Sequence, residues 1–272
     1  PDYIKVAGMK AIADNFTKYT PGNGILELRQ AIVKKLKEDN GLDYTVNEVT
    51  TAVGAKQAIA SAMMVIAGPG DEVLLPIPCW VSYTEMIRLA GATPVFVPVR
   101  QDNYELDLDA IRAAITPRTK AIVICTPNNP TGAVYSEESL RELADLAVKH
   151  DFFIVADEIY EKIVYDGAKH FSVASISREV WERTITVNGF SKAYAMTGWR
   201  IGYAAVRADV IKGIMAVQSQ TTSATSAISQ KAALAALQGS QHDMQVMVEE
   251  FKRRKDYVVQ RLNAIEAVSY TH

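Results

Sequence analysis

Long apolar runs are absent from this chain of 272 residues, and so is an excess of charge of either sign. No stretch approaches the length of a membrane-spanning helix, so we expect a protein without a membrane segment. Lys and Arg number 29 and Asp and Glu number 31, which leaves a net charge of -2. That balance offers no basic surface for nucleic acid or for an anionic membrane.

Cysteine is also scarce, and two familiar nucleotide-binding signatures are missing. Cys79 and Cys125 are too few for a disulfide framework, which favours a reducing compartment and predicts a cytoplasmic protein. Neither G-x-G-x-x-G nor G-x-x-x-x-G-K-[ST] occurs, so dinucleotide-binding and P-loop classes lose their main support. We assign no residue to a metal site.

The two ends of the chain predict that it is an internal piece of a longer protein. It begins without methionine and without the apolar segment of a signal peptide. It stops at Ser269–His272, where we expect a strand to start. From about Asp243 onward, a charged amphipathic pattern predicts a long helix that leaves the domain.

Short β-rich runs alternate with helical patterns. The predicted strands are Glu48–Val53, Glu72–Leu75, Thr93–Val97, Lys120–Cys125, Phe152–Ala156, Thr184–Val187 and Ile201–Ala205. Helices are predicted at Leu26–Lys37, Lys56–Ala67, Val81–Leu89 and Leu108–Ile115, and after the candidate N-cap Ser136. The alternation predicts an α/β fold, a mainly parallel seven-stranded sheet sandwiched by helices. Ligands of such sheets bind beyond the carboxyl ends of the strands.

A lysine with unusual neighbours lies in the run Asn188–Tyr203. Small and apolar residues crowd Lys192, and Arg200 follows eight positions later. A crowded amine is partly desolvated, which favours the neutral form that attacks carbonyl groups. Arg200 offers a bidentate grip on phosphate. Alternatively, Lys192 extends to solvent and Arg200 pairs with a surface acid.

Two turns that follow predicted strands could bind parts of a ligand. Gly54, Ala55 and Lys56 lead into a helix through small residues, which lets a phosphate reach backbone N–H groups, although a plain turn is the alternative. Asn129 stands in a rigid turn between two prolines. We predict that a cis Asn129–Pro130 bond aims the Asn129 amide inward, toward a ligand oxygen.

Asp157 closes an apolar strand, and Tyr160 follows three residues later. Asp157 is either a helix N-cap or a partly buried carboxylate that pairs with a cation, such as a protonated ring nitrogen. The phenol of Tyr160 can reach the same ligand. Together these stretches supply a phosphate cradle, an oxygen partner, an acid for a ring nitrogen and a carbonyl-seeking lysine. Those groups describe a site for pyridoxal phosphate.

From about Tyr19 to its end, the chain resembles the class I pyridoxal-phosphate-dependent aminotransferases of fold type I, the aspartate aminotransferase family. The motifs that carry the resemblance are Gly189-Phe190-Ser191-Lys192 with Arg200-Ile201-Gly202, Asn129-Pro130-Thr131-Gly132 and Asp157-Glu158-Ile159-Tyr160. The bacterial branch, which includes aspartate and aromatic or prephenate aminotransferases, is the most similar.

The resemblance implies a role for each matching residue. Lys192 would bond covalently to the cofactor and move a proton, and Asp157 would pair with the pyridine nitrogen. Asn129 and Tyr160 would hydrogen-bond the phenolic oxygen. The remaining contacts implied are stacking by Trp80 and phosphate binding by the turn at Gly54, Ala55 and Lys56 together with Arg200. Relatives often carry a hydroxyl residue where Gly189 stands, so a hydroxyl contact to the phosphate at this position is expected to be missing.

The resemblance also implies a homodimer with composite sites, in which Tyr19 hydrogen-bonds the phosphate held by the other subunit. Residues 1–20 would form an N-terminal segment near the dimer interface, and 21–242 the large cofactor-binding domain. Residues 243–272 would form a long connecting helix and the start of a truncated small domain. The N-terminal arm, and the small-domain arginine that grips the substrate α-carboxylate, would lie outside this chain.

The expected activity is transfer of an amino group between an L-amino acid, of aspartate or aromatic type, and a 2-oxo acid such as 2-oxoglutarate. The segment Ile59–Ile66 holds no basic residue, which counts against a strict aspartate preference. Two alternatives stay open. One is a pyridoxal-phosphate lyase or synthase on the same scaffold, because a fold does not fix the reaction. The other is a non-catalytic ligand-sensing module.

Overall fold

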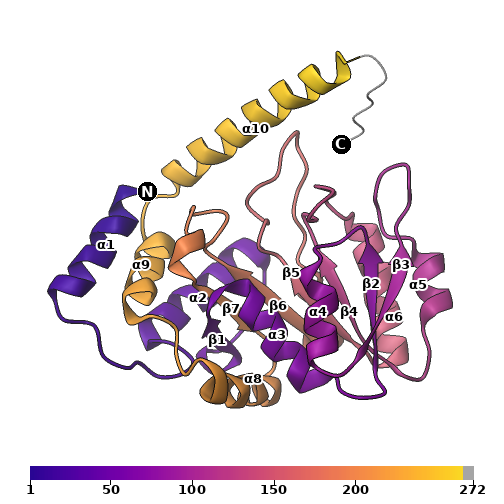
Figure 1. Ribbon diagram of the computed structural model, residues 1–272, viewed down its shortest axis with the longest axis horizontal. Helices are drawn as coiled ribbons and strands as arrows, with labels where there is room; N and C mark the ends of the chain where they lie inside the picture. The colour runs from indigo at the N-terminus through magenta and orange to yellow at the C-terminus, as the bar shows by residue number, and fades with distance from the viewer. Residues whose placement is uncertain (266–272) are drawn as a thin grey trace.

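Seven strands form one sheet in the computed structural model, which describes residues 1–265 (Figure 1). In chain order they are β1 (Val49–Ala52), β2 (Glu72–Ile77), β3 (Thr93–Pro98), β4 (Thr119–Cys125), β5 (Phe153–Asp157), β6 (Thr184–Gly189) and β7 (Gly202–Ala205). The spatial order is β1-β7-β6-β5-β4-β2-β3. β7 is antiparallel to β1 and β6, and the other pairs are parallel. The predicted α/β fold with a mainly parallel seven-stranded sheet is confirmed.

Helices cover both faces of the sheet (Figure 1). Within residues 1–265 they are α1 (Asp2–Ala13), α2 (Leu26–Asn40), α3 (Gly54–Ile66), α4 (Ser82–Leu89), α5 (Leu108–Ala114), α6 (Glu137–His150), α7 (Arg178–Arg183), α8 (Ala208–Thr221), α9 (Ala227–Gln238) and α10 (His242–Asn263). The five helices predicted before residue 150 correspond to α2–α6. Ser136 caps α6 as predicted, since its Oγ accepts the N–H of Ser139 at 3.2 Å.

Alternate residues of the central strands pack into different cores. Val123 and Cys125 of β4 pack with α3, α4 and α8, whereas Ile122 and Ile124 pack with α5 and α6. Successive side chains of a strand point to opposite faces, so a sheet covered on both sides needs apolar residues at every position. A third core joins β1 and β7 to α1, α2 and α9.

Strand direction brings distant loops to one edge of the sheet. β1, β2, β4, β5 and β6 run the same way, so their carboxyl ends lie at the same edge. β7 runs in the opposite direction and therefore begins at that edge. The strand ends and connections that meet there carry Gly54, Trp80, Asn129, Asp157, Lys192 and Arg200.

The helix α10 leaves the body of the domain and extends beyond the sheet (Figure 1). Of its 22 residues only Met244 is buried, which agrees with the long helix predicted from about Asp243. The strand expected at Ser269–His272 lies outside the described residues, and the division of the chain into domains stays a prediction. In the described part of the chain, no helix combines the length and apolar character needed to cross a membrane.

Candidate active site

A cavity of about 330 Å³ opens at the sheet edge where these loops meet. Its lining residues are Ala55, Lys56, Trp80, Tyr83, Asn129, Asp157, Ile159, Tyr160, Ser191, Lys192, Thr197 and Arg200. The sequence-predicted site residues are all among them except Gly54 and Tyr19. The structure therefore brings together groups from five separate strand ends and from the start of β7.

Asp157 is the last residue of β5, and its carboxyl group is buried, with 3% of the residue exposed. Its Oδ2 accepts a hydrogen bond from the Tyr83 phenol at 2.7 Å, and its Oδ1 accepts one from the N–H of Ile159 at 3.2 Å. Burial raises the pKa of Asp157 to about 6, although both hydrogen bonds and the charge of Lys192 lower it. Turns, not a helix, follow β5, so the alternative of a helix N-cap is wrong.

Lys192 and Tyr160 face the same space from two neighbouring turns. Lys192 follows β6, is half-buried, and places its Nζ 5.5 Å from the centre of the Tyr160 ring. Burial raises the pKa of the Tyr160 phenol, and a hydrogen bond with the Asn129 side chain opposes that rise. An amine, a phenol and an amide from three adjacent strand ends thus line one cavity.

The turn that carries Asn129 is held by its own neighbours. Asn128 Oδ1 accepts the N–H of Thr131 at 3.1 Å, and the Asn128 carbonyl accepts the N–H of Gly132 at 2.9 Å. The Asn129–Pro130 bond is cis, as predicted, and so are the Thr126–Pro127 and Ile77–Pro78 bonds. The turn aims the Asn129 side chain into the cavity.

Arg200 forms a positively charged corner with the start of α3. Its Nη1 donates to the carbonyl of Thr197 at 2.9 Å, and its Nη2 donates to the carbonyl of Val53 at 3.2 Å. Gly54 has φ +78°, and a Cβ there would lie 2.6 Å from Arg200 Nη2, so glycine is what leaves room for the guanidinium. Arg200 itself has φ +52°, a left-handed conformation that is uncommon for a residue other than glycine. The unpaired N–H groups at the N-terminus of α3 add to this corner, which suits a phosphate.

Trp80 forms one wall of the cavity, with an aromatic and a basic neighbour. Its ring meets that of Tyr83 edge-on, with centres 5.3 Å apart and an angle of 87°. Lys56 Nζ lies 4.8 Å from the centre of the Trp80 ring. Sequence reasoning missed Tyr83, the second residue of α4, because no local signal showed that its phenol contacts Asp157.

Tyr19 does not reach the cavity of its own chain. It is 96% exposed in the segment that joins α1 to α2. There it borders an open depression formed by Thr17–Thr20 and Ala224–Ile228. Its predicted role in the site of a partner subunit stays a prediction.

With this geometry in place, comparison with known proteins defines the class. The solved structure of the Rhizobium meliloti aspartate aminotransferase superposes with a TM-score of 0.95 at 43% identity, covering 97% of this chain and 67% of that one. The Thermus thermophilus aspartate aminotransferase with maleate gives 0.92 at 46% identity, covering 97% and 69%. The fold is therefore that of the large domain of fold type I aminotransferases.

The family follows from the sequence comparisons. The model of aminotransferase class I and II matches residues 1–272, and the chain belongs to that family. It is 44% identical over 266 residues to the aspartate aminotransferase of Bacillus sp. (strain YM-2), covering 97% of this chain and 68% of that protein. It is 47% identical over 274 residues to that of Pinus pinaster, of which it spans only 56%. The expected family is confirmed.

Tyr83→Phe tests whether the Tyr83 hydrogen bond controls the charge of Asp157. A hydrogen bond to a charged group is worth about 1.5–3 kcal/mol, and about 1.4 kcal/mol corresponds to one pH unit. We therefore expect the Asp157 pKa to rise from about 6 by roughly 1–2 pH units. Carboxyl ¹³C NMR titration of the complete, cofactor-free protein measures it, with Tyr135→Phe as the control for loss of another buried phenol.

The same shift changes stability in a defined direction. Between pH 3.8 and about 6, folded protein holds a proton on Asp157 that the unfolded chain has lost. The free energy of unfolding therefore falls as pH rises through this window. In the Tyr83→Phe variant, the fall in the free energy of unfolding should extend to higher pH, because the pKa of Asp157 is higher. An unchanged Asp157 titration in Tyr83→Phe would contradict this account.

Proposed function

We propose that the protein containing this chain is a pyridoxal-phosphate-dependent aminotransferase that exchanges an amino group between an L-amino acid and a 2-oxo acid. The observation that carries this proposal is the convergence of Lys192, Asp157 and Arg200 on one cavity. Membership of the class I and II aminotransferase family supports it, because that family uses pyridoxal phosphate.

The residues of the cavity fit this cofactor group by group. The Asp157 carboxyl is buried, no cation among residues 1–265 is in direct contact with it, and a protonated pyridine nitrogen would supply one. The corner of Arg200 and the α3 N-terminus suits the phosphate, and the missing Cβ of Gly54 keeps it open. The Lys192 amine suits the aldehyde. Bound pyridoxal phosphate supplies an electron sink that stabilises negative charge on the substrate Cα.

The protein orients and tunes that chemistry. Asp157 would hold a protonated ring nitrogen through a charge pair, and its burial would make that pair stronger than in water. Asn129 and Tyr160 line the same cavity and would hydrogen-bond the phenolic oxygen of the cofactor. Lys192 Nζ removes the proton from the substrate Cα and returns one in the reverse half of the cycle. Trp80 covers one face of the site and excludes water.

Lys192→Ala tests the proposed reaction in the complete protein. We expect transfer from aspartate to 2-oxoglutarate to fall by at least roughly 10²–10⁴-fold, the range for loss of a general base. Borohydride reduction followed by peptide mapping should locate the cofactor on Lys192 in the wild type and on no residue in the variant. Lys212→Ala, an exposed lysine of α8, is the matched control.

Two outcomes would overturn parts of this assignment. A reduced adduct on Lys56 would show that Lys192 is not the lysine that bonds to the cofactor. Release of ammonia or pyruvate without an oxo-acid acceptor would favour a lyase on the same scaffold.

The substrate class within the proposal is an acidic amino acid. Lys56 lines the cavity together with Lys192 and Arg200, and its side chain is the basic one that is not assigned to the cofactor. Relatives at 44–47% identity are named aspartate aminotransferases, and one solved relative holds maleate. The segment Ile59–Ile66 lacks a basic residue, but the side chain of Lys56 provides an ammonium group beside Trp80.

The substitution Lys56→Met should therefore weaken the binding of aspartate more than the binding of phenylalanine. A hydrogen bond to a charged group is worth about 1.5–3 kcal/mol, so we expect KM for aspartate to rise roughly 10–100-fold and KM for phenylalanine to change little. Lys56→Arg, which keeps the charge, should retain most of the selectivity. Steady-state kinetics with both amino acids measure these KM values. An equal rise in KM for both would show that Lys56 does not distinguish the substrate side chains.

A homodimer with composite sites belongs to the same proposal. Tyr19 is almost fully exposed and remote from its own cavity, as expected of a side chain that serves a partner. Co-expression of Lys192→Ala and Tyr19→Ala chains gives mixed dimers with one site that has both residues intact. That site should bind the cofactor as tightly as the wild type, and more tightly than the Tyr19→Ala homodimer. Equal weakening in the mixed and mutant dimers would place Tyr19 outside the partner's site.

A reducing, cytoplasmic location is also part of the proposal. Cys79 and Cys125 are both free thiols. Disulfides persist in oxidising compartments, so free cysteines agree with a reducing one. Fractionation of cells that express the complete protein would test the location.

A further inference from the structure

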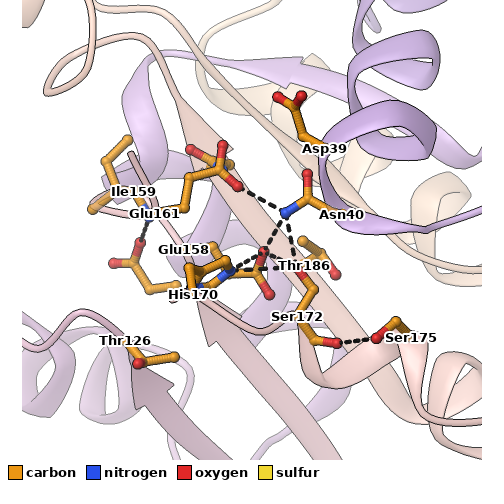
Figure 2. A network of polar contacts seen from close by, with 12 residues as sticks. Asp39, Asn40, Thr126, Glu158, Ile159, Glu161, His170, Ser172, Ser175 and Thr186 are labelled. Carbon is orange, nitrogen blue, oxygen red and sulfur yellow. Dashed lines mark hydrogen bonds and ion pairs between the residues drawn. The ribbon is translucent and has the colours of Figure 1, made fainter. Parts of the chain in front are cut away.

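A buried polar network joins Glu158 and Glu161 to Asn40, His170 and Ser172 (Figure 2). Asp157 and Glu158 are consecutive, and successive side chains of a strand point to opposite faces. Asp157 therefore faces the cavity, whereas Glu158 faces α2 and the segment around His170. Glu161, three residues after Glu158, turns the same way as Glu158 (Figure 2).

Glu158 is held by three side chains. Its Oε2 accepts a hydrogen bond from Ser172 Oγ at 2.8 Å and lies 3.1 Å from His170 Nε2. Asn40 Nδ2 approaches the same oxygen at 3.4 Å. The Glu158 and His170 side chains are only 1% and 8% exposed, so their ion pair is shielded from solvent.

Glu161 is held from α2. Lys35 Nζ pairs closely with Glu161 Oε1, and Asn40 Nδ2 donates to Glu161 Oε2 at 2.7 Å. Asn40 also donates to Ser172 Oγ at 2.7 Å and accepts from Lys35 Nζ at 2.7 Å. Asn40, at the end of α2, thus joins the two carboxylates into one network.

The network is neutral only when His170 carries a proton. Two carboxylates then face two cations, Lys35 and His170, and loss of the proton leaves one buried negative charge without a cation. Burial disfavours the charged imidazole, but the charge and hydrogen bond of Glu158 outweigh it and raise the pKa of His170. Burial likewise works against ionised Glu161, and Lys35 outweighs it and lowers the pKa of Glu161. An uncompensated buried charge is strongly destabilising.

The groups that face this cluster come from every element packed around it. Besides the turn itself, the charged and titratable ones include Lys35 and Asp39 of α2, Lys162 beside Asp39, and the phenols of Tyr44, Tyr194 and Tyr203. Glu158, Glu161 and His170 bring ligand atoms within 4.8 Å of one another, as a metal site would. Lys35 already supplies the cation at Glu161, so we treat the cluster as an ion-pair network.

We propose that this network positions Asp157 and Tyr160 from behind, and that a proton on His170 holds it together. The proposal rests on the aminotransferase function proposed above. The turn is closed by the N–H of Glu161, which donates to the carbonyl of Glu158 at 2.9 Å. Tyr160 lies between these two anchored acids, so movement of either one displaces its phenol. Glu158 and His170 are positioning residues in this arrangement, since they act through Tyr160 and Asp157.

Charge counting defines the variants that test the proposal. Glu158→Gln leaves Glu161 and Lys35, a balanced pair that needs no proton on His170. His170→Gln leaves two carboxylates and one cation. The double variant, Glu158→Gln with His170→Gln, again has one carboxylate, Glu161, and one cation, Lys35. Glu137→Gln and His150→Gln, both at the exposed ends of α6, are the matched controls.

Histidine NMR titration of the complete protein, with and without cofactor, is the readout independent of activity. We expect His170 to titrate above 6.5 in the wild type and at a lower pH in Glu158→Gln. A raised pKa gives stability that is fully present below pH 6.5 and lost as pH rises through the folded-state pKa. The free energy of unfolding should therefore fall over that range in the wild type and not in Glu158→Gln.

Kinetics of the loaded enzyme test the link to the active site. In the wild type, kcat should fall as His170 loses its proton while KM changes little, and Glu158→Gln should lose this pH dependence. His170→Gln should lower kcat roughly tenfold, the effect of about 1.4 kcal/mol, and the double variant should recover most of that loss. If His170→Gln does not fold, the wild type, Glu158→Gln and the double variant still decide the question.

Two results would overturn the proposal. One is a Glu158→Gln variant in which kcat depends on pH in the same way as in the wild type. The other is a double variant as impaired as His170→Gln. If instead the protein shows no aminotransferase activity at all, the proposed function fails, while the NMR titration and the pH dependence of unfolding still test the network by themselves.

Discussion

A carboxylate buried at the end of β5 is the constraint around which the cavity is organised. Asp157 receives hydrogen bonds from Tyr83 and Ile159, yet burial still raises its pKa to about 6. Two hydrogen bonds offset only part of the cost of removing a charge from water. The carboxylate therefore favours a cationic partner in the cavity, and a protonated ring nitrogen fits that requirement. Lys192 approaches from the neighbouring strand end and lines the same cavity.

Strand direction and two glycines determine how Arg200 and the start of α3 are placed at the cavity that contains Asp157. β7 runs against its neighbours and so delivers Arg200 to the edge where the parallel strands end. β7 can lie against the start of α3 because Gly202 has no Cβ, which would lie 2.7 Å from the backbone nitrogen of Ala55. Gly54 leaves space for the guanidinium in the same way. The phosphate corner is therefore a property of backbone packing as much as of charged side chains.

The turn after β5 divides its side chains between two environments. Asp157 and Tyr160 line the cavity, while Glu158 and Glu161 enter a buried network with Lys35, Asn40 and His170 (Figure 2). The consecutive residues Asp157 and Glu158 point in different directions, as neighbouring side chains of an extended chain do. Three residues later, Tyr160 and Glu161 are divided between the cavity and the network in the same way. Residues of the cavity and residues of the buried network thus come from one short stretch of chain.

Local patterns in the sequence were enough to predict the strands, the helices α2–α6 and the family motifs around Asn129, Asp157 and Lys192. Apolar runs, turn residues and caps act between near neighbours in the chain, so a single sequence displays them. The helices α1, α7, α8 and α9 were missed, and the alanine-rich α9 has little contrast between its faces. Only the tertiary structure decided that Tyr83 binds Asp157, 74 residues away, and that Asn40 joins Glu158 and Glu161. Those contacts depend on strand order and on which face each side chain takes, and neither is encoded by adjacent residues.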